Sequence, residues 1–244
     1  MLTSLAKIIL APALLKQARY VRTHTPRLPE PEGPREGVIE GAADTQSDVS
    51  PLRVLIVGDS AGAGVGVERQ EQALSGQLLR CLQHTFPGRR IHWCLWAKNG
   101  DTTAMALIKL HLRPRQDFDV VITSLGVNDV TRNVRPYRFR RQQQALVDLL
   151  TSKFSARHVI LTAVPPMHSF PALPQPLRWF LGQQASRLTR ELDTVAAVND
   201  NCEVLDVAFP LEPGLMASDG FHPGEKGYPL WAEAIVKRIV EAKL

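Results

Sequence analysis

The sequence of 244 residues is poor in cysteine, with only Cys81, Cys94 and Cys202, and it contains no C-x-x-C pair. An odd number of widely spaced cysteines argues against a disulfide framework, and the missing pair argues against a zinc site. We therefore expect three reduced thiols that serve as core residues, and a cytoplasmic protein. Peripheral attachment to a membrane is the alternative location.

The sequence also lacks a hydrophobic run long enough to span a membrane. The apolar core of the N-terminal segment covers only residues 8–15 and is interrupted by Pro12, whereas a membrane-spanning helix needs about 20 apolar residues. A signal peptide would begin with basic residues and end in a small-residue cleavage site, and this segment does neither. Lys16, Arg19 and Arg22 instead predict a kinked amphipathic helix. We favour packing of this helix on the domain, and contact of residues 1–22 with a membrane surface is the alternative.

Strong charge of one sign is absent as well, since the formal net charge is +5. Nothing in the sequence resembles a nucleic-acid-binding module, so we expect no nucleic-acid partner. Much of the positive excess lies in one run that comprises Arg132, Arg135, Arg138, Arg140 and Arg141. Such a run is typical of a solvated helix face and less often attracts anionic lipid or substrate. The sequence carries no signal for the oligomeric state.

Residues 24–50 are rich in proline, glycine and acidic residues, which is typical of a linker. We therefore divide the chain into an N-terminal helix with its linker, residues 1–50, and a domain, residues 51–244. In the domain, short apolar runs alternate with longer segments of helical spacing. The predicted strands are Val54–Val57, Ile91–Trp96, Val120–Leu125, Val159–Val164 and Val204–Val207, and the predicted helices cover 68–86, 103–112, 137–153, 177–199 and 225–243. This alternation predicts a parallel sheet with helices on both faces, a three-layer α/β/α sandwich.

A glycine-rich loop follows the first predicted strand, in the segment VLIVGDSAGAGVGV at residues 54–67. It is not a P-loop, because no lysine lies between Arg53 and Lys98. It does not fit a dinucleotide-binding loop either, because its later glycines are spaced G-x-G-x-G and the second strand does not end in an acidic residue. The phosphate-binding interpretation therefore fails on both patterns.

The same loop suits a serine nucleophile better. Ser60 directly follows the strand, and residues 58–62 match the G-x-S-x-G pattern, in which a tight turn exposes the hydroxyl group. The alternative is that Ser60 caps the following helix. A serine hydroxyl also needs a general base, and the base needs a third group that orients it.

Among the histidines, His222 is the candidate base. It lies three residues after Asp219 in the segment ASDGFHPGEKGY, which follows the last predicted strand. This spacing lets the carboxylate of Asp219 reach the imidazole, fix its tautomer and stabilise the imidazolium that forms during proton transfer. The alternative is a loop that starts a helix, with Asp219 as its cap.

Acyl transfer also needs donors for the developing oxyanion. Asn128 follows the third predicted strand in SLGVNDVT, and Gly100 follows the second in KNGDTT. An amide side chain and two backbone N–H groups, those of Gly100 and Ser60, could converge there, because ligands of such sheets bind beyond the carboxyl ends of the strands. Taken singly, each segment could also be a plain turn or a helix cap.

Together these four segments resemble the SGNH hydrolases, also called GDSL esterases, over roughly residues 52–243. The resemblance implies a flavodoxin-like sheet of five parallel strands in the order 2-1-3-4-5. It implies that Ser60 is the nucleophile, that Ser60, Gly100 and Asn128 supply the oxyanion donors, and that Asp219 and His222 complete the triad. Ala61 replaces the leucine of the GDSL name, so no subfamily is indicated.

We predict a serine hydrolase that cleaves carboxylic esters with short- to medium-chain acyl groups, in a small-molecule or lipid substrate, through an acyl-enzyme. The mechanism requires no cofactor and no metal. One alternative is a specialised O-deacetylase, thioesterase or lysophospholipase of the same family. The non-enzymatic alternative is a lipid- or membrane-surface-binding protein that uses the N-terminal helix.

The proline-rich segment 165–180 follows the fourth predicted strand. We expect it to border the acyl pocket, with Met167, Phe170 and Leu173 as candidate contacts, although it could equally pack on the sheet edge. Asp59 and Asp129 adjoin the proposed site, and we expect each to brace a loop through backbone hydrogen bonds.

Overall fold

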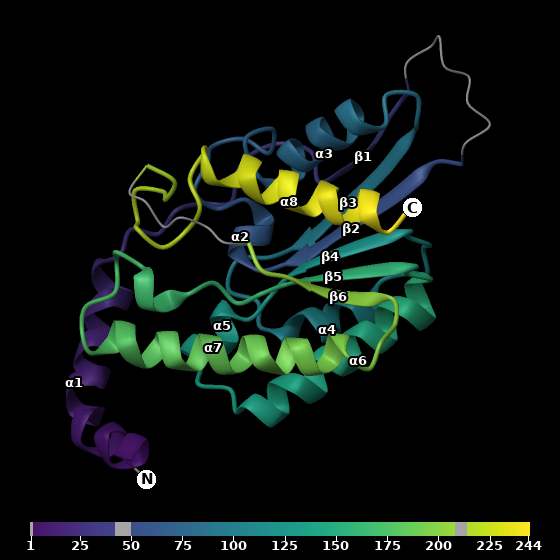
Figure 1. Cartoon of the computed structure of the whole chain (residues 1–244). Helices are drawn as coiled ribbons and strands as arrows, with labels where there is room; N and C mark the ends of the chain where they lie inside the picture. The colour runs from purple at the N-terminus through teal and green to yellow at the C-terminus, as the bar shows by residue number, and fades with distance from the viewer. Residues whose placement is uncertain (1, 42–49, 208–213) are drawn as a thin grey trace.

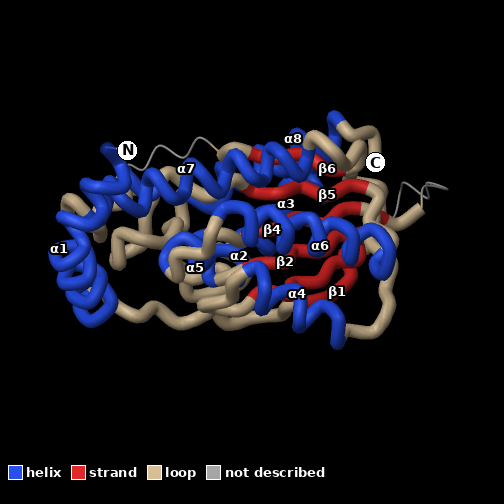
Figure 2. Tube along the Cα trace, turned by 90° about the horizontal axis from the view of Figure 1, so that it is seen from below, coloured by secondary structure: helices blue, strands red, loops and turns tan. Residues whose placement is uncertain are grey.

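The computed structural model describes residues 2–41, 50–207 and 214–244, with side chains from residue 9 onward. Within this part, helices cover both faces of one central sheet (Figure 1). One face carries the helices α3 (Leu74–Thr85) and α8 (Gly227–Glu241). The other face, nearer the viewer in Figure 2, carries α4 (Thr103–Leu112), α6 (Pro136–Phe154) and α7 (Leu177–Ala196). The predicted three-layer α/β/α sandwich is thus confirmed.

The described strands form one sheet in the order β1-β3-β2-β4-β5-β6. Their bounds are β1 (Glu36–Ile39), β2 (Leu52–Gly58), β3 (Ile91–Ala97), β4 (Val120–Ser124), β5 (His158–Thr162) and β6 (Cys202–Leu205). Strands β2 to β6 pair in parallel. Counted by themselves, these five strands have the predicted order 2-1-3-4-5.

The strand β1 corrects the sequence analysis, which assigned residues 36–39 to a linker and expected five strands instead of six. β1 runs antiparallel to β3 and covers what would otherwise be an open edge of the sheet. The unpaired backbone groups of an edge strand readily accept a further strand. Residues 36–38 are exposed and Ile39 is half-buried, so the segment lacks the apolar alternation by which a strand is identified in a sequence.

The start of α3 is a second difference, because the helix was expected from residue 68 and begins at Leu74. The preceding turn is organised around Gln70, whose side chain donates to the Ala63 carbonyl at 3.0 Å and accepts from the Ser75 hydroxyl at 2.7 Å. The Gln70 N–H donates to the carbonyl of Glu32 at 2.8 Å. The contact with Glu32 joins residues distant in sequence, and none of these contacts follows a helical spacing, so periodicity alone does not reveal the turn.

Apolar side chains fill the layers on both sides of the sheet. Alternate residues of β2 point to opposite faces, with Val54 and Ile56 toward α3 and α8, and Leu55 and Val57 toward α4, α6 and α7. Continuous apolar strands are what a sheet covered on both faces requires. Of the three cysteines, Cys94 and Cys202 are buried, Cys81 is half-buried, and all are free thiols.

The register of the sheet places the ends of its three central strands at one level. Gly58, the last residue of β2, pairs with Ala97 at the end of β3 and with Ser124 at the end of β4. The loops that leave these strands therefore start side by side. They carry the candidate nucleophile and both other candidate oxyanion donors.

The N-terminal helix α1 (Leu2–His24) contains Pro12 and lies at one end of the sandwich, beside the start of α7 (Figure 1). Leu14 is buried in this contact. The Gln17 side chain donates to the Gln175 carbonyl at 2.5 Å and accepts from the Leu177 N–H at 3.0 Å. The second half of α1 thus packs on the domain. No helix in the described ranges is long and apolar enough to cross a membrane.

Candidate active site

Ser60 stands at the turn between the end of β2 and the short helix α2 (Ser60–Ala63). Asp59 caps this helix, since its carboxylate accepts from the Ala61 N–H at 3.2 Å. The Asp59 N–H donates to the Ser124 carbonyl at 2.9 Å and ties the turn to β4. The cap is therefore Asp59 and not Ser60, whose hydroxyl group remains available for another partner.

That partner is His222. The Oγ atom of Ser60 lies 2.8 Å from Nε2 of His222, and Nδ1 of the same ring lies 2.6 Å from Oδ2 of Asp219. The other carboxylate oxygen of Asp219 accepts from the backbone N–H groups of Phe221 at 2.9 Å and His222 at 3.0 Å. A hydroxyl group, an imidazole and a carboxylate are thus connected in series.

The surroundings of Asp219 keep its carboxyl group ionised. Burial acts to raise its pKa, but hydrogen bonds from the side chain and backbone of His222 and from the Phe221 N–H outweigh burial and lower the pKa below its ordinary value. Since Asp219 remains an anion, its Oδ2 accepts a hydrogen bond from the protonated Nδ1 of His222, and the neutral ring then has its unprotonated Nε2 toward Ser60.

The glycines after Ser60 allow close approach of the segment that carries His222. Gly66 has a φ of +116°, and a Cβ atom there would lie 2.1 Å from the carbonyl oxygen of Pro223. Gly64 has a φ of +93°, and its Cβ would lie 2.4 Å from that of Ala73. The glycines that fail as a phosphate-binding loop therefore serve tight packing beside the nucleophile.

Asn128 and Gly100 lie on neighbouring loops at the same end of the sheet. Asn128 belongs to the short helix α5 (Val127–Thr131), and its Nδ2 donates to the Asp101 carbonyl at 3.0 Å, which ties it to the loop of Gly100. In the described part of the chain, the backbone N–H groups of Ser60 and Gly100 donate to no protein acceptor. Both groups are therefore available to a ligand.

Asp129 braces these loops, as the sequence analysis expected. Its Oδ2 accepts from the N–H of Thr103 at 3.0 Å and from the Thr103 hydroxyl at 3.1 Å, and Gln143 donates to that hydroxyl at 2.9 Å. Burial raises the pKa of Asp129. Thr103 and Gln143 were missed, because neither belongs to a motif.

Tyr228 in α8 was also missed. Its ring is fully buried, and its hydroxyl group donates to the carbonyls of Val65 at 2.6 Å and Ala61 at 3.3 Å. The residue thus connects α8 to the loop that holds Ser60. Its position six residues after His222 is the only sequence signal that could have suggested this role.

Two hollows border the imidazole of His222. The first is a mainly apolar cavity of about 70 Å³, lined by Ser60, His222 and side chains that include Leu125, Val127, Ala163, Phe170, Val207 and Phe221. The second is an open groove of about 970 Å³ between α1, the start of α7, the loop of Asn99 and the end of α5.

The three candidate pocket contacts lie in different places. Phe170 lines the apolar cavity and packs edge-on against Phe221, with 5.0 Å between ring centroids. Leu173 lines the groove. Met167 is fully buried in the core, and it is not among the described residues that line either hollow. The proline-rich segment thus borders the site through Phe170 and Leu173.

Comparison with known proteins matches residues 56–230 to the GDSL-like lipase/acylhydrolase family. Among solved structures, the chain is similar to a lipase/acylhydrolase from Enterococcus faecalis, with 24% identity, a TM-score of 0.59, and 77% of this chain and 95% of that chain covered. It is also similar to an esterase from Pseudoalteromonas sp., with 20% identity, a TM-score of 0.59, and 78% of this chain and 97% of that chain covered. An acetyl xylan esterase from Geobacillus stearothermophilus is similar with 19% identity and a TM-score of 0.55, and the match covers 78% of this chain and 94% of that chain. At these identities the likeness shows the shared fold. No curated protein sequence matches the chain.

Proposed function

Because the chain belongs to the GDSL-like lipase/acylhydrolase family, whose members are ester-cleaving hydrolases, we propose that it cleaves carboxylic esters through a serine nucleophile, Ser60, and an acyl-enzyme. The observation that carries this proposal is the 2.8 Å contact between Ser60 Oγ and His222 Nε2, in a ring whose other nitrogen lies 2.6 Å from Asp219. A serine that donates to an oriented imidazole is activated for attack.

In the first step, Ser60 Oγ attacks the ester carbonyl carbon while His222 Nε2 takes its proton. Asp219 holds the ring and stabilises the imidazolium, which then protonates the oxygen of the departing alcohol. In the second step, His222 removes a proton from water, the hydroxide attacks the acyl-enzyme, and the acid leaves as Ser60 regains its proton.

The oxyanion of each tetrahedral intermediate would be held by the backbone N–H groups of Ser60 and Gly100 and by the side-chain amide of Asn128. The Asn128 amide donates one of its two hydrogens to the Asp101 carbonyl in the structure, which leaves the second hydrogen for the oxyanion. Preorganised donors of this kind are worth about 3 kcal/mol each in transition-state stabilisation.

The volume of the apolar cavity supports a short acyl group. One water molecule needs roughly 10–15 Å³ of such space, so about 70 Å³ suits a few carbon atoms. This observation makes an O-deacetylase the second candidate, and one structural neighbour is an acetyl xylan esterase. A series of 4-nitrophenyl esters from acetate to octanoate separates the two. A maximum at acetate favours deacetylation, and a maximum at butyrate or beyond favours the general esterase.

The test of the nucleophile is labelling with a fluorophosphonate, followed by mapping of the modified residue. We expect the label on Ser60 and a fall in kcat on the order of 10⁶-fold for Ser60→Ala with 4-nitrophenyl butyrate. Ser169→Ala is the matched control, because Ser169 is exposed at the end of the short 3-10 helix Met167–Ser169 and this variant should retain labelling and turnover. Wild-type turnover by Ser60→Ala, or a label on another residue, would refute the proposal.

A further inference from the structure

The open groove beside His222 is lined by four arginines. Arg19 and Arg22 belong to α1, Arg27 follows that helix, and Arg132 lies at the end of α5. Apolar side chains line the groove between them, namely Leu15, Val21, Leu28, Leu173, Leu177 and Leu181. The surface is therefore cationic and apolar at the same time.

The positive charge in the groove is not neutralised by the described protein. The acidic residue among the described lining is Asp219, whose carboxylate is engaged by His222. Among the residues that the structure describes, no ion pair involves any of these four arginines, and Arg132 donates to the Gly100 carbonyl at 3.3 Å. Planar guanidinium groups in such a setting bind carboxylate or phosphate groups well.

The groove is continuous with the proposed reaction centre. Phe221 and His222 line both the groove and the apolar cavity, and Asn99 of the groove precedes Gly100. The proposed mechanism releases the alcohol first, while the acyl group stays bound to Ser60. The small apolar cavity suits the part that stays, and the larger, more open groove suits the part that leaves.

We propose that the groove binds the alcohol part of the substrate, and that this part carries an acidic group, a carboxylate or a phosphate, on the arginines. This inference rests on the proposed function and names the class of ester on which the enzyme acts. The leucines contact the apolar portion between the ester bond and the acidic group.

The helix α1 supplies two of the four arginines, so the proposed preference for acidic alcohols depends on a segment outside the family domain. It lies outside residues 56–230, the part that matches the family. Leu14 and Gln17 hold it against the start of α7, so Arg19 and Arg22 lie in a fixed position and not on a free tail. The family domain alone would lack one wall of the groove.

The experiment compares esters of one acyl group that differ only in the charge of the alcohol. One pair is 4-nitrophenyl butyrate and its 3-carboxy derivative, and the other is glycerol monobutyrate and its 3-phosphate. The measured quantity is the ratio of kcat/KM for the anionic to the neutral ester in each pair, so differences in intrinsic reactivity cancel between variants.

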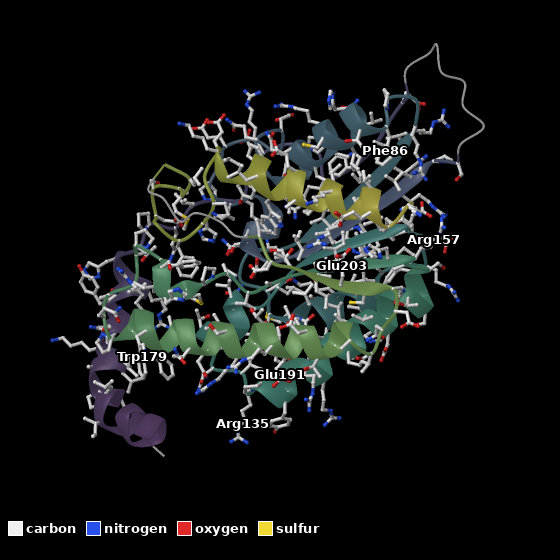
Figure 3. The ribbon with its side chains drawn as sticks, in the orientation of Figure 1. Phe86, Arg135, Arg157, Trp179, Glu191 and Glu203 are labelled. Atoms are coloured by element: carbon white, nitrogen blue, oxygen red, sulfur yellow. The ribbon has the colours of Figure 1, made fainter. Side chains whose placement is uncertain are left out.

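For the double variant Arg19→Gln/Arg22→Gln, we expect this ratio to fall about five- to thirtyfold in the pair whose acidic group, carboxylate or phosphate, binds in the groove. In the wild type, raised salt should lower the same ratio, because salt screens the attraction between the arginines and the acidic group. The matched control is Arg135→Gln/Arg141→Gln, which removes the same charge from the first turns of α6 and from the residue that precedes it. Both control residues are exposed and lie outside the groove, and Figure 3 shows Arg135 pointing away from the body of the molecule.

A fall in the first pair assigns the carboxylate, and a fall in the second assigns the phosphate. Unchanged ratios in both pairs, with turnover of the neutral esters that still depends on Ser60, would overturn the inference while leaving the proposed function intact. An equal fall in the control variant would also overturn it, because net charge would then explain the preference. Absence of any Ser60-dependent turnover would instead refute the proposed function.

Discussion

The carboxyl group of Asp59 lies directly before the proposed nucleophile, and burial raises its pKa to about 7. In the unfolded chain the same group ionises near its ordinary pKa of 3.8. Between these values the folded protein binds more protons than the unfolded chain, so through this group the free energy of unfolding falls as the pH rises from about 4 to about 7.

We therefore predict that Asp59→Asn gains stability relative to the wild type as the pH rises. Asparagine keeps an oxygen that can accept from the Ala61 N–H, and it cannot ionise. Between pH 5 and pH 8 the difference in unfolding free energy should move by roughly 2–3 kcal/mol in favour of the variant, at about 1.4 kcal/mol per pH unit below pH 7. Urea denaturation at the two pH values measures it, and a constant difference would contradict the prediction.

Phe170 is the aromatic residue of the proline-rich segment 165–180 that lines the apolar cavity. We predict that Phe170→Val enlarges the cavity and raises kcat/KM for hexanoate relative to butyrate by about tenfold, since one methylene group is worth about 1–3 kcal/mol in such a pocket. The control is Met167→Val in the same segment, which loosens packing without lining the cavity. A chain-length profile that stays unchanged in Phe170→Val, or shifts equally in Met167→Val, would show that Phe170 does not limit the acyl group.

At the scale of elements, the loop after α2 and the loop of His222 fit together only because Gly66 has no side chain. We predict that Gly66→Ala lowers the rate of fluorophosphonate labelling of Ser60 by at least tenfold, because the new Cβ would overlap the Pro223 carbonyl and move His222 away. The variant should still fold, as thermal unfolding will show. Wild-type labelling in the folded variant would contradict this account.

Whether a contact lies within one element or joins two distant elements explains which parts of the site could be predicted. Asp219 and His222 are three residues apart, so their contact is local and visible as a spacing. The hydroxyl group of Tyr228 reaches carbonyls 163 and 167 residues earlier in the chain, and a single-chain pattern carries no signal for such a contact. The strand β1 escaped prediction for a related reason, since an exposed edge strand needs no apolar alternation.

At the scale of the whole molecule, Cys94 in β3 and Cys202 in the edge strand β6 can serve as probes of unfolding in two different parts of the sheet. Burial raises the pKa of both thiols, that of Cys202 to about 12. We predict that neither reacts with a disulfide reagent in the folded protein, and that both become reactive at the same denaturant concentration if the sheet unfolds cooperatively. In a Cys81→Ser background, earlier labelling of Cys202 would show that the β6 edge opens alone.

The sequence by itself determined the layered architecture, the order in which the chemical groups appear, and the local pair of Asp219 and His222. Apolar periodicity and short spacings are properties of neighbouring residues, so they survive in a linear chain. Only the tertiary structure decided that the Ser60 hydroxyl meets an imidazole 162 residues away, that α1 forms one wall of a cationic groove, and that a sixth strand covers the sheet edge. Each of these depends on the packing of distant segments, where the distances between atoms are set by the fold as a whole.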